Sequence, residues 1–78
     1  MTGVEIYGWT PGFNTVECDK LITSAIGIGL KQAKDIVDSV LNGNTETVYI
    51  NSIDDAQSFV AALRGVGANA RVVLANRK

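Results

Sequence analysis

Histidine is absent from this sequence, and cysteine, proline and long apolar runs are nearly so. Without histidine, the chain lacks the commonest metal ligand and the side chain most used for proton transfer at neutral pH. Its one cysteine, Cys18, cannot form a disulfide within the chain, and its place in an apolar helix stripe favours a core position. No nucleophile–base pair or metal-ligand cluster stands out. We therefore expect a protein that is not an enzyme and that holds no metal and no cofactor.

Signals for membranes and export are missing as well. No apolar run approaches the roughly 18 residues that a membrane-spanning helix needs. The first residues, MTGVEIYGW, lack the basic start and apolar centre of a signal peptide. The sequence therefore predicts a cytoplasmic protein without membrane contact.

Net charge is also low, since seven basic and eight acidic residues give a formal value of −1. No overall field would draw the chain onto nucleic acid, so such binding would need a local basic patch. Hydrophobic residues make up 46% of the chain and charged residues 19%, which indicates a packed globular fold. A chain of 78 residues has room for one modest core. We expect residues 1–78 to form a single domain.

Three segments alternate between inward and outward side chains with the period of two that is typical of a half-buried strand. They are residues 4–9, 45–51 and 70–74. The first is followed by Thr10-Pro11-Gly12, which favours a tight turn because proline fixes φ at the second position and glycine accepts a positive φ at the third. The residues predicted to face a core are Val4, Ile6, Val48, Ile50, Ala70, Val72 and Leu74.

Three further segments carry one apolar stripe at helical spacing. Asn14 is the predicted N-cap of the first helix, with Glu17 completing a capping box. The second helix is predicted at residues 30–41, and Ser52 is the predicted N-cap of the third. The predicted core-facing residues of the helices are Cys18, Leu21, Ile22, Ala25, Leu30, Ala33, Val37, Leu41, Ile53, Ala56, Phe59, Val60 and Leu63.

The resulting order of elements is β-α-α-β-α-β. Short strands and helices with a single apolar face pack most simply in two layers. We predict an α+β fold in which three helices cover one face of a three-stranded antiparallel sheet.

The segment GIGLKQ before the second helix raises the question of a phosphate-binding loop. A Walker-type loop needs Gly-Lys followed by Ser or Thr after a strand, and a dinucleotide fingerprint needs a third glycine. Here Leu30 separates Gly29 from Lys31, Gln32 stands where the third glycine should be, and the preceding element is a helix. We interpret the segment as a tight turn between helices, in which Gly27 adopts the left-handed conformation and Gly29 permits close approach.

The same region resembles a known family. Residues 27–37, GIGLKQAKDIV, are similar to the GLGLKEAKDLV signature of the bacterial ribosomal stalk protein, large-subunit protein seven/twelve. The similarity runs without gaps over residues 14–39 and returns at Asp54-Asp55-Ala56 and Gly67-Ala68. It covers nearly the whole chain but only the C-terminal domain of that family, and we expect a free-standing copy of that domain. The resemblance implies a β-α-α-β-α-β fold that binds translational GTPases through its first two helices.

Carried over by position, the family's binding patch falls on Val16, Asp19, Lys20, Thr23 and Lys34. Val16, Lys20 and Lys34 match the family pattern. Asp19 stands in place of an aliphatic residue and Thr23 in place of an arginine. Because the altered patch would suit a new partner, a small inhibitor or adaptor of phage-encoded, immunity or protease-adaptor type is an alternative hypothesis.

A second candidate surface is the sheet face opposite the helices. Tyr7, Trp9, Tyr49 and Arg71 are predicted to lie there with nothing to cover them. Exposed aromatic side chains beside an arginine are typical of a homodimer interface or of a platform for nucleic-acid bases. We favour a protein partner over nucleic acid, because the chain as a whole carries no positive field.

Overall fold

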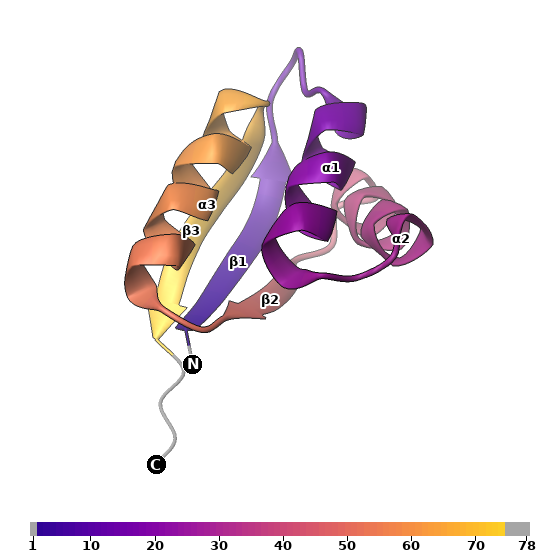
Figure 1. The fold of residues 1–78 in the computed structure, drawn as a ribbon. Helices are drawn as coiled ribbons and strands as arrows, with labels where there is room; N and C mark the ends of the chain where they lie inside the picture. The colour runs from indigo at the N-terminus through magenta and orange to yellow at the C-terminus, as the bar shows by residue number, and fades with distance from the viewer. Residues whose placement is uncertain (1, 75–78) are drawn as a thin grey trace.

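The computed structural model describes residues 2–74, apart from the side chain of Leu74. The six elements follow in the predicted order β-α-α-β-α-β (Figure 1). Their bounds are β1 Thr2–Trp9, α1 Thr15–Ile26, α2 Leu30–Leu41, β2 Glu46–Ile50, α3 Ile53–Gly65 and β3 Ala68–Leu74.

The three strands form an antiparallel sheet in the order β2-β1-β3. β1 is central, so that Val4 lies opposite Val48 on one side and Val72 on the other. The three helices lie against one face of this sheet, with α1 between α3 and α2 in Figure 1. This arrangement confirms the predicted α+β fold.

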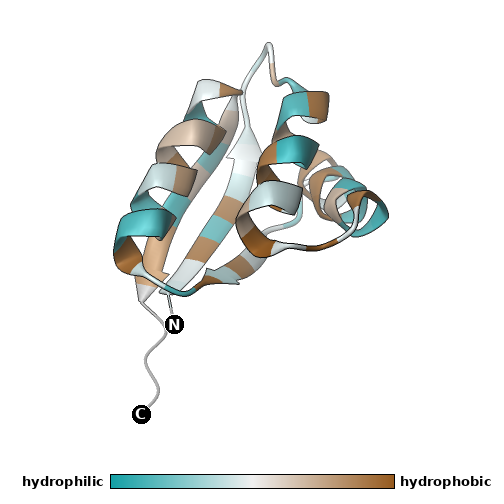
Figure 2. Cartoon of the chain, in the orientation of Figure 1, coloured by the Kyte–Doolittle hydropathy of each residue, from teal (hydrophilic) through white to brown (hydrophobic). Residues whose placement is uncertain are grey.

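The core lies between the sheet and the helices, and every element contributes to it. Hydrophobic and hydrophilic bands alternate along β1 in Figure 2, as the period of two requires. None of the helices in residues 2–74 has the length and apolar character that a bilayer crossing requires. The buried apolar residues are Val4, Ile6, Cys18, Ile22, Ala33, Val37, Val40, Val48, Ile50, Ala56, Phe59, Val60, Leu63, Ala68 and Ala70.

Four helix residues predicted to face the core are exposed instead, namely Ala25, Leu30, Leu41 and Ile53. Leu30 and Ile53 are each the first residue of a helix. Helix side chains lean toward the N-terminus, so the side chain of a first residue points off the end of the helix. Leu41 lies to one side of the buried stripe, rotated about 80° from Ala33 at 100° per residue, and Val40 is buried in its place.

Both predicted N-caps are present. The Asn14 side chain accepts a hydrogen bond from the Glu17 backbone N–H, and the Ser52 hydroxyl accepts one from Asp55 N–H, each at 3.1 Å. The reciprocal half of the capping box does not form, because Asn14 N–H donates to the Val66 carbonyl at 2.8 Å. This bond ties the start of α1 to the end of α3.

The turn between α1 and α2 is a helix-helix connection, as predicted. Gly27 ends α1 with a φ of 71°, in the left-handed region, and its N–H donates to the Thr23 carbonyl at 3.0 Å. The prediction for Gly29 is wrong. A methyl group there would meet nothing within 4 Å, and its φ of −70° is available to any residue.

Candidate partner-binding surfaces

The solvent-facing side of α1 presents one apolar and one basic side chain in succession. Val16 is 59% exposed, and Lys20 lies one turn further along the helix. Thr23 is half-buried, and its hydroxyl donates to the Lys20 carbonyl at 2.9 Å. Lys20 Nζ also lies 3.5 Å from Glu17 Oε2, but both side chains are mostly exposed and the pair contributes little. The Lys20 ammonium therefore remains available to a partner.

Asp19 does not belong to that exposed surface, contrary to the prediction. Its side chain is only 6% exposed, and its Oδ1 has no hydrogen-bond partner among the described residues. At 100° per residue Asp19 lies about 60° from the buried Ile22, on the edge of the core stripe. The sequence held this signal, but the prediction followed the position of Asp19 in the binding patch of the resembled family.

The Asp19 carboxyl lies close to charged side chains of α2. Burial raises the pKa of the Asp19 carboxyl above its ordinary value. The Lys34 ammonium opposes that rise, and the Asp38 carboxylate adds to it. Both of these side chains come from α2, which packs against α1. Lys34 is thus an exposed cation beside the junction of the two helices.

Leu30 joins this surface, although sequence reasoning assigned it to the core. It is 53% exposed, and it precedes Lys34 by four residues, so the two side chains are neighbours on α2. Its position as the first residue of α2 was the available signal. We call the set Val16, Lys20, Thr23, Leu30 and Lys34 the α1/α2 face.

The opposite face of the sheet brings together three of the four residues predicted for it. Arg71 Nη2 lies 2.6 Å from Glu5 Oε1, and Arg71 Cζ lies 5.2 Å from the centre of the Tyr7 ring. Tyr49 is 55% exposed and packs over Gly3, where an added Cβ would lie 3.4 Å from the Tyr49 ring. The positive charge of Arg71 is therefore already paired within the sheet.

Trp9 is the exception, and the prediction of its face is wrong. The pairing of β1 with β3 shifts between Ile6 and Gly8, which is a bulge at Tyr7. Beyond the bulge Trp9 lies opposite Ala68, a buried residue of the helix-covered face. Residues directly opposite each other in an antiparallel pair share a face. Trp9 accordingly stacks on Phe13, with ring centres 6.5 Å apart.

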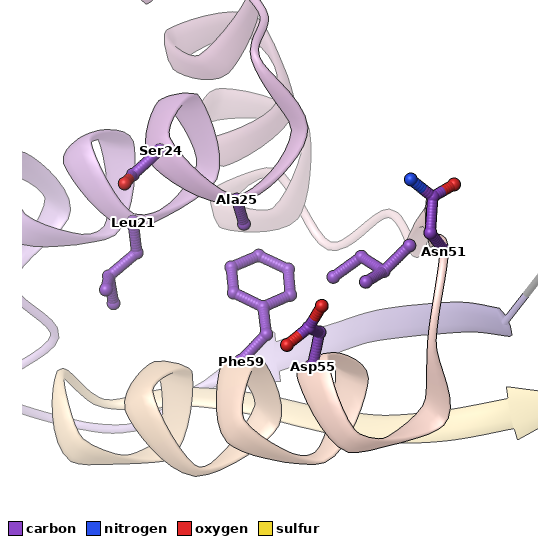
Figure 3. A pocket seen from close by; sticks show the side chains of 7 residues that line it. Leu21, Ser24, Ala25, Asn51, Asp55 and Phe59 are labelled. Atoms are coloured by element: carbon purple, nitrogen blue, oxygen red, sulfur yellow. The ribbon is translucent and has the colours of Figure 1, made fainter.

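A pocket of about 380 Å³ opens between α1 and α3, on the other side of α1 from α2. Figure 3 shows the Phe59 ring rising from α3 toward Ala25 on α1, with the Asp55 carboxylate beside the ring. The lining residues are Leu21, Ser24, Ala25, Ile50, Asn51, Asp55 and Phe59. This pocket was not predicted, because it joins segments far apart in the sequence.

Cys18 lies in the core as predicted. It is 1% exposed, and burial raises the pKa of its thiol to about 11, with the neighbouring Asp19 charge adding to the rise. The thiol is therefore protonated and inaccessible at neutral pH. Among residues 2–74, no three Cys, Asp or Glu side chains are grouped so that they could hold a metal ion.

The sequence of the chain is similar to that of known ribosomal proteins. No protein-family model matches the chain. It is similar to large ribosomal subunit protein bL12 of Buchnera aphidicola subsp. Acyrthosiphon pisum, in strains Tuc7, 5A and APS, at 37% identity over 71 residues. The match covers 91% of this chain and 56% of each relative, so the chain spans about half the length of the curated relatives it matches. The chain is homologous to the ribosomal stalk protein and resembles its C-terminal domain.

Proposed function

We propose that this chain is a stalk-type protein-binding domain whose α1/α2 face binds an acidic surface of a protein partner, and that this partner is a translational GTPase. Homology to a ribosomal protein supports a non-enzymatic role in translation and a cytoplasmic location. The observation that carries the proposal is the pairing of exposed apolar and basic side chains on two adjacent helices. Because the match covers 56% of each relative, the activity of the whole relative is carried over here only as part of this proposal.

The chemistry of the α1/α2 face suits such a partner. Val16 and Leu30 expose aliphatic surface that gains from burial in a complex, at about 25 cal/mol per Å² of apolar area. Lys20 and Lys34 add two positive charges that steer an acidic partner and fix its orientation. The burial of Asp19 matters here, because its carboxylate does not stand among the contacts. A partner would therefore meet the two lysines without direct contact with the Asp19 carboxylate.

The test is a binding measurement with purified chain and a purified bacterial translational GTPase. Reversing both charges of the face, in Lys20→Glu with Lys34→Glu, should weaken binding at least about tenfold, since each lost rim contact becomes a repulsion. Lys31→Glu and Lys34→Glu alone, each a single charge reversal on α2, are the matched pair. Lys31 is an exposed lysine turned about 160° from the Ala33 stripe, about 60° further round α2 than Lys34, so Lys31→Glu should weaken binding less than Lys34→Glu does.

Two outcomes would contradict the proposal. Equal weakening by Lys31→Glu and by Lys34→Glu alone would show attraction by net charge without a defined face. Failure of the unmodified chain to bind any translational GTPase, while it captures another acidic protein through the same lysines, would favour the inhibitor or adaptor hypothesis.

A second candidate function uses the open sheet face. Tyr7 and Tyr49 are exposed there, whereas the Arg71 charge is paired with Glu5. That pairing favours contact with a second copy of the chain over contact with phosphates. Light scattering should then show a dimer that Tyr49→Lys dissociates, and a monomer at high concentration would exclude it.

A further inference from the structure

The pocket between α1 and α3 has a lining of mixed polar and apolar surface with a single charged group. Leu21, Ala25, Ile50 and Phe59 supply the apolar surface, and Asp55 is the only charged residue of the lining. Among residues 2–74, no side chain forms an ion pair with the Asp55 carboxylate or donates a hydrogen bond to it. The lining therefore offers a carboxylate without a cation.

Asp55 lies at a position of α3 that favours an acidic residue. It lies in the first turn of α3, where the helix dipole stabilises a carboxylate. Asp54 lies in the same turn but does not line the pocket. The dipole accounts for both acidic residues, but only Asp55 lines the pocket, and its carboxylate lies beside the Phe59 ring in Figure 3.

We propose that this pocket binds the side chain of an arginine presented by a partner polypeptide. The three methylenes of arginine match the apolar surface of Leu21 and Ala25, and the guanidinium matches the Asp55 carboxylate. A planar guanidinium also bonds a carboxylate through two parallel N–H groups. Asn51 and Ser24 add polar atoms at the edge of the same pocket.

The size and place of the pocket favour a side chain over a free small molecule. A volume of about 380 Å³ is near the lower end of the roughly 300–1,000 Å³ that small-molecule sites occupy. The pocket lies between two helices at the surface, and Ser24, Ala25 and Asp55 are exposed around it. A polypeptide backbone can therefore stay outside while one side chain enters.

This inference goes beyond the proposed function, because it concerns the other flank of α1 and a ligand of opposite charge. The α1/α2 face presents lysines to an acidic partner, whereas the pocket presents a carboxylate to a basic group. The two sites share no residue. Each is therefore open to a test that leaves the other unchanged.

The experiment is a titration of ¹⁵N-labelled chain with acetyl-Ala-Arg-Ala-amide, followed by NMR. Saturable shifts are expected at the backbone amides of Ala25, Asn51, Asp55 and Phe59, with a dissociation constant on the order of millimolar for one side chain. The matching peptide with citrulline, which keeps the shape and loses the charge, should bind at least about fivefold more weakly.

Paired variants separate recognition in the pocket from general attraction. Asp55→Asn should weaken the arginine peptide at least about fivefold, and Asp54→Asn, which removes the same charge from the same turn, less than about twofold. Ala25→Leu fills the pocket from α1 and should abolish the shifts while the fold, checked by the remaining spectrum, persists. Lys20→Glu with Lys34→Glu should leave peptide binding unchanged even where GTPase binding is lost.

Several results would overturn the proposal. These are the absence of saturable shifts at the pocket, equal weakening by Asp54→Asn and Asp55→Asn, or equal binding of the citrulline peptide. The last titration uses agmatine, a free guanidinium compound without peptide groups. If agmatine binds at least as tightly as the peptide and the peptide groups add nothing, the pocket is a small-molecule site and the polypeptide partner is wrong.

Discussion

Charged residues are accommodated differently at two contacts of the fold. Within residues 2–74, the charged residue at the contact between α3 and β3 is hydrogen-bonded, and the one at the contact between α1 and α2 is not. Arg64, in the last turn of α3, donates from Nε and Nη2 to the Ala70 carbonyl of β3 at 3.2 and 3.1 Å. Asp19, between α1 and α2, leaves a buried carboxylate oxygen without a donor among the described residues. A buried polar group without a partner costs roughly 1–3 kcal/mol. The hydrogen bonds of Arg64 stabilise the α3–β3 contact. The unpartnered oxygen of Asp19 lowers the stability of the α1–α2 contact, next to the face that we propose binds a partner.

The largest effect is expected from the core under α3. Leu63 is fully buried, so Leu63→Ala should lower the free energy of unfolding by about 2–5 kcal/mol through lost burial and a residual cavity. Leu41→Ala is the matched deletion on α2, where the leucine is at the surface, and it should cost less than about 1 kcal/mol. Urea denaturation measures both. A larger loss for Leu41→Ala would reverse the comparison.

The next prediction is a gain in stability rather than a loss. Asp19→Leu removes the buried carboxylate and should raise the free energy of unfolding at neutral pH by about 1–2 kcal/mol. Because the pKa of Asp19 is raised in the fold, its native state binds a proton more readily than the unfolded state does. The unmodified chain should therefore lose stability relative to the variant as pH rises from the ordinary value of 3.8 through the raised one. Urea denaturation of both proteins at a series of pH values measures this. A difference between their free energies of unfolding that does not change with pH would contradict the prediction.

A smaller loss is expected at the turn between α1 and α2. Gly27→Ala forces a side chain into the left-handed region and should cost about 1–2 kcal/mol. Gly29→Ala is the matched control, because its φ is ordinary and the added methyl group meets open space. It should be neutral or slightly stabilising. Thermal unfolding of the two variants decides, and equal losses would contradict the account of this turn.

The smallest effect should come from the α3–β3 contact itself. Arg64→Met keeps much of the apolar stem and removes the donors to the Ala70 carbonyl, which should cost about 0.5–1.5 kcal/mol. Denaturant unfolding measures this loss. A gain in stability would show that the bond is not favourable.

Local chemistry was predictable from the sequence, whereas contacts between distant segments were not. Asn14 and Ser52 were correctly predicted as N-caps, because a cap depends on residues within one turn. Gly27 was correct for the same reason. The face of Trp9 was wrong, because the bulge at Tyr7 depends on pairing with β3, about sixty residues further along the chain.

The candidate site divides in the same way. The resemblance to the stalk protein selected Val16, Lys20 and Lys34, which the structure leaves exposed. It also selected Asp19, whose burial depends on the direction from which α2 packs against α1. The position of a neighbouring helix is not encoded in one amphipathic stripe, so a residue at the edge of that stripe can be assigned to either side.

An NMR titration of ¹⁵N-labelled chain with a purified bacterial translational GTPase tests the central claim most directly. The account predicts shifts or line broadening concentrated at the amides of Val16, Lys20, Thr23, Leu30 and Lys34, with the amides of Tyr7, Tyr49 and Arg71 unchanged. Changes confined to those three sheet residues, or a spectrum that the GTPase does not alter, would contradict it.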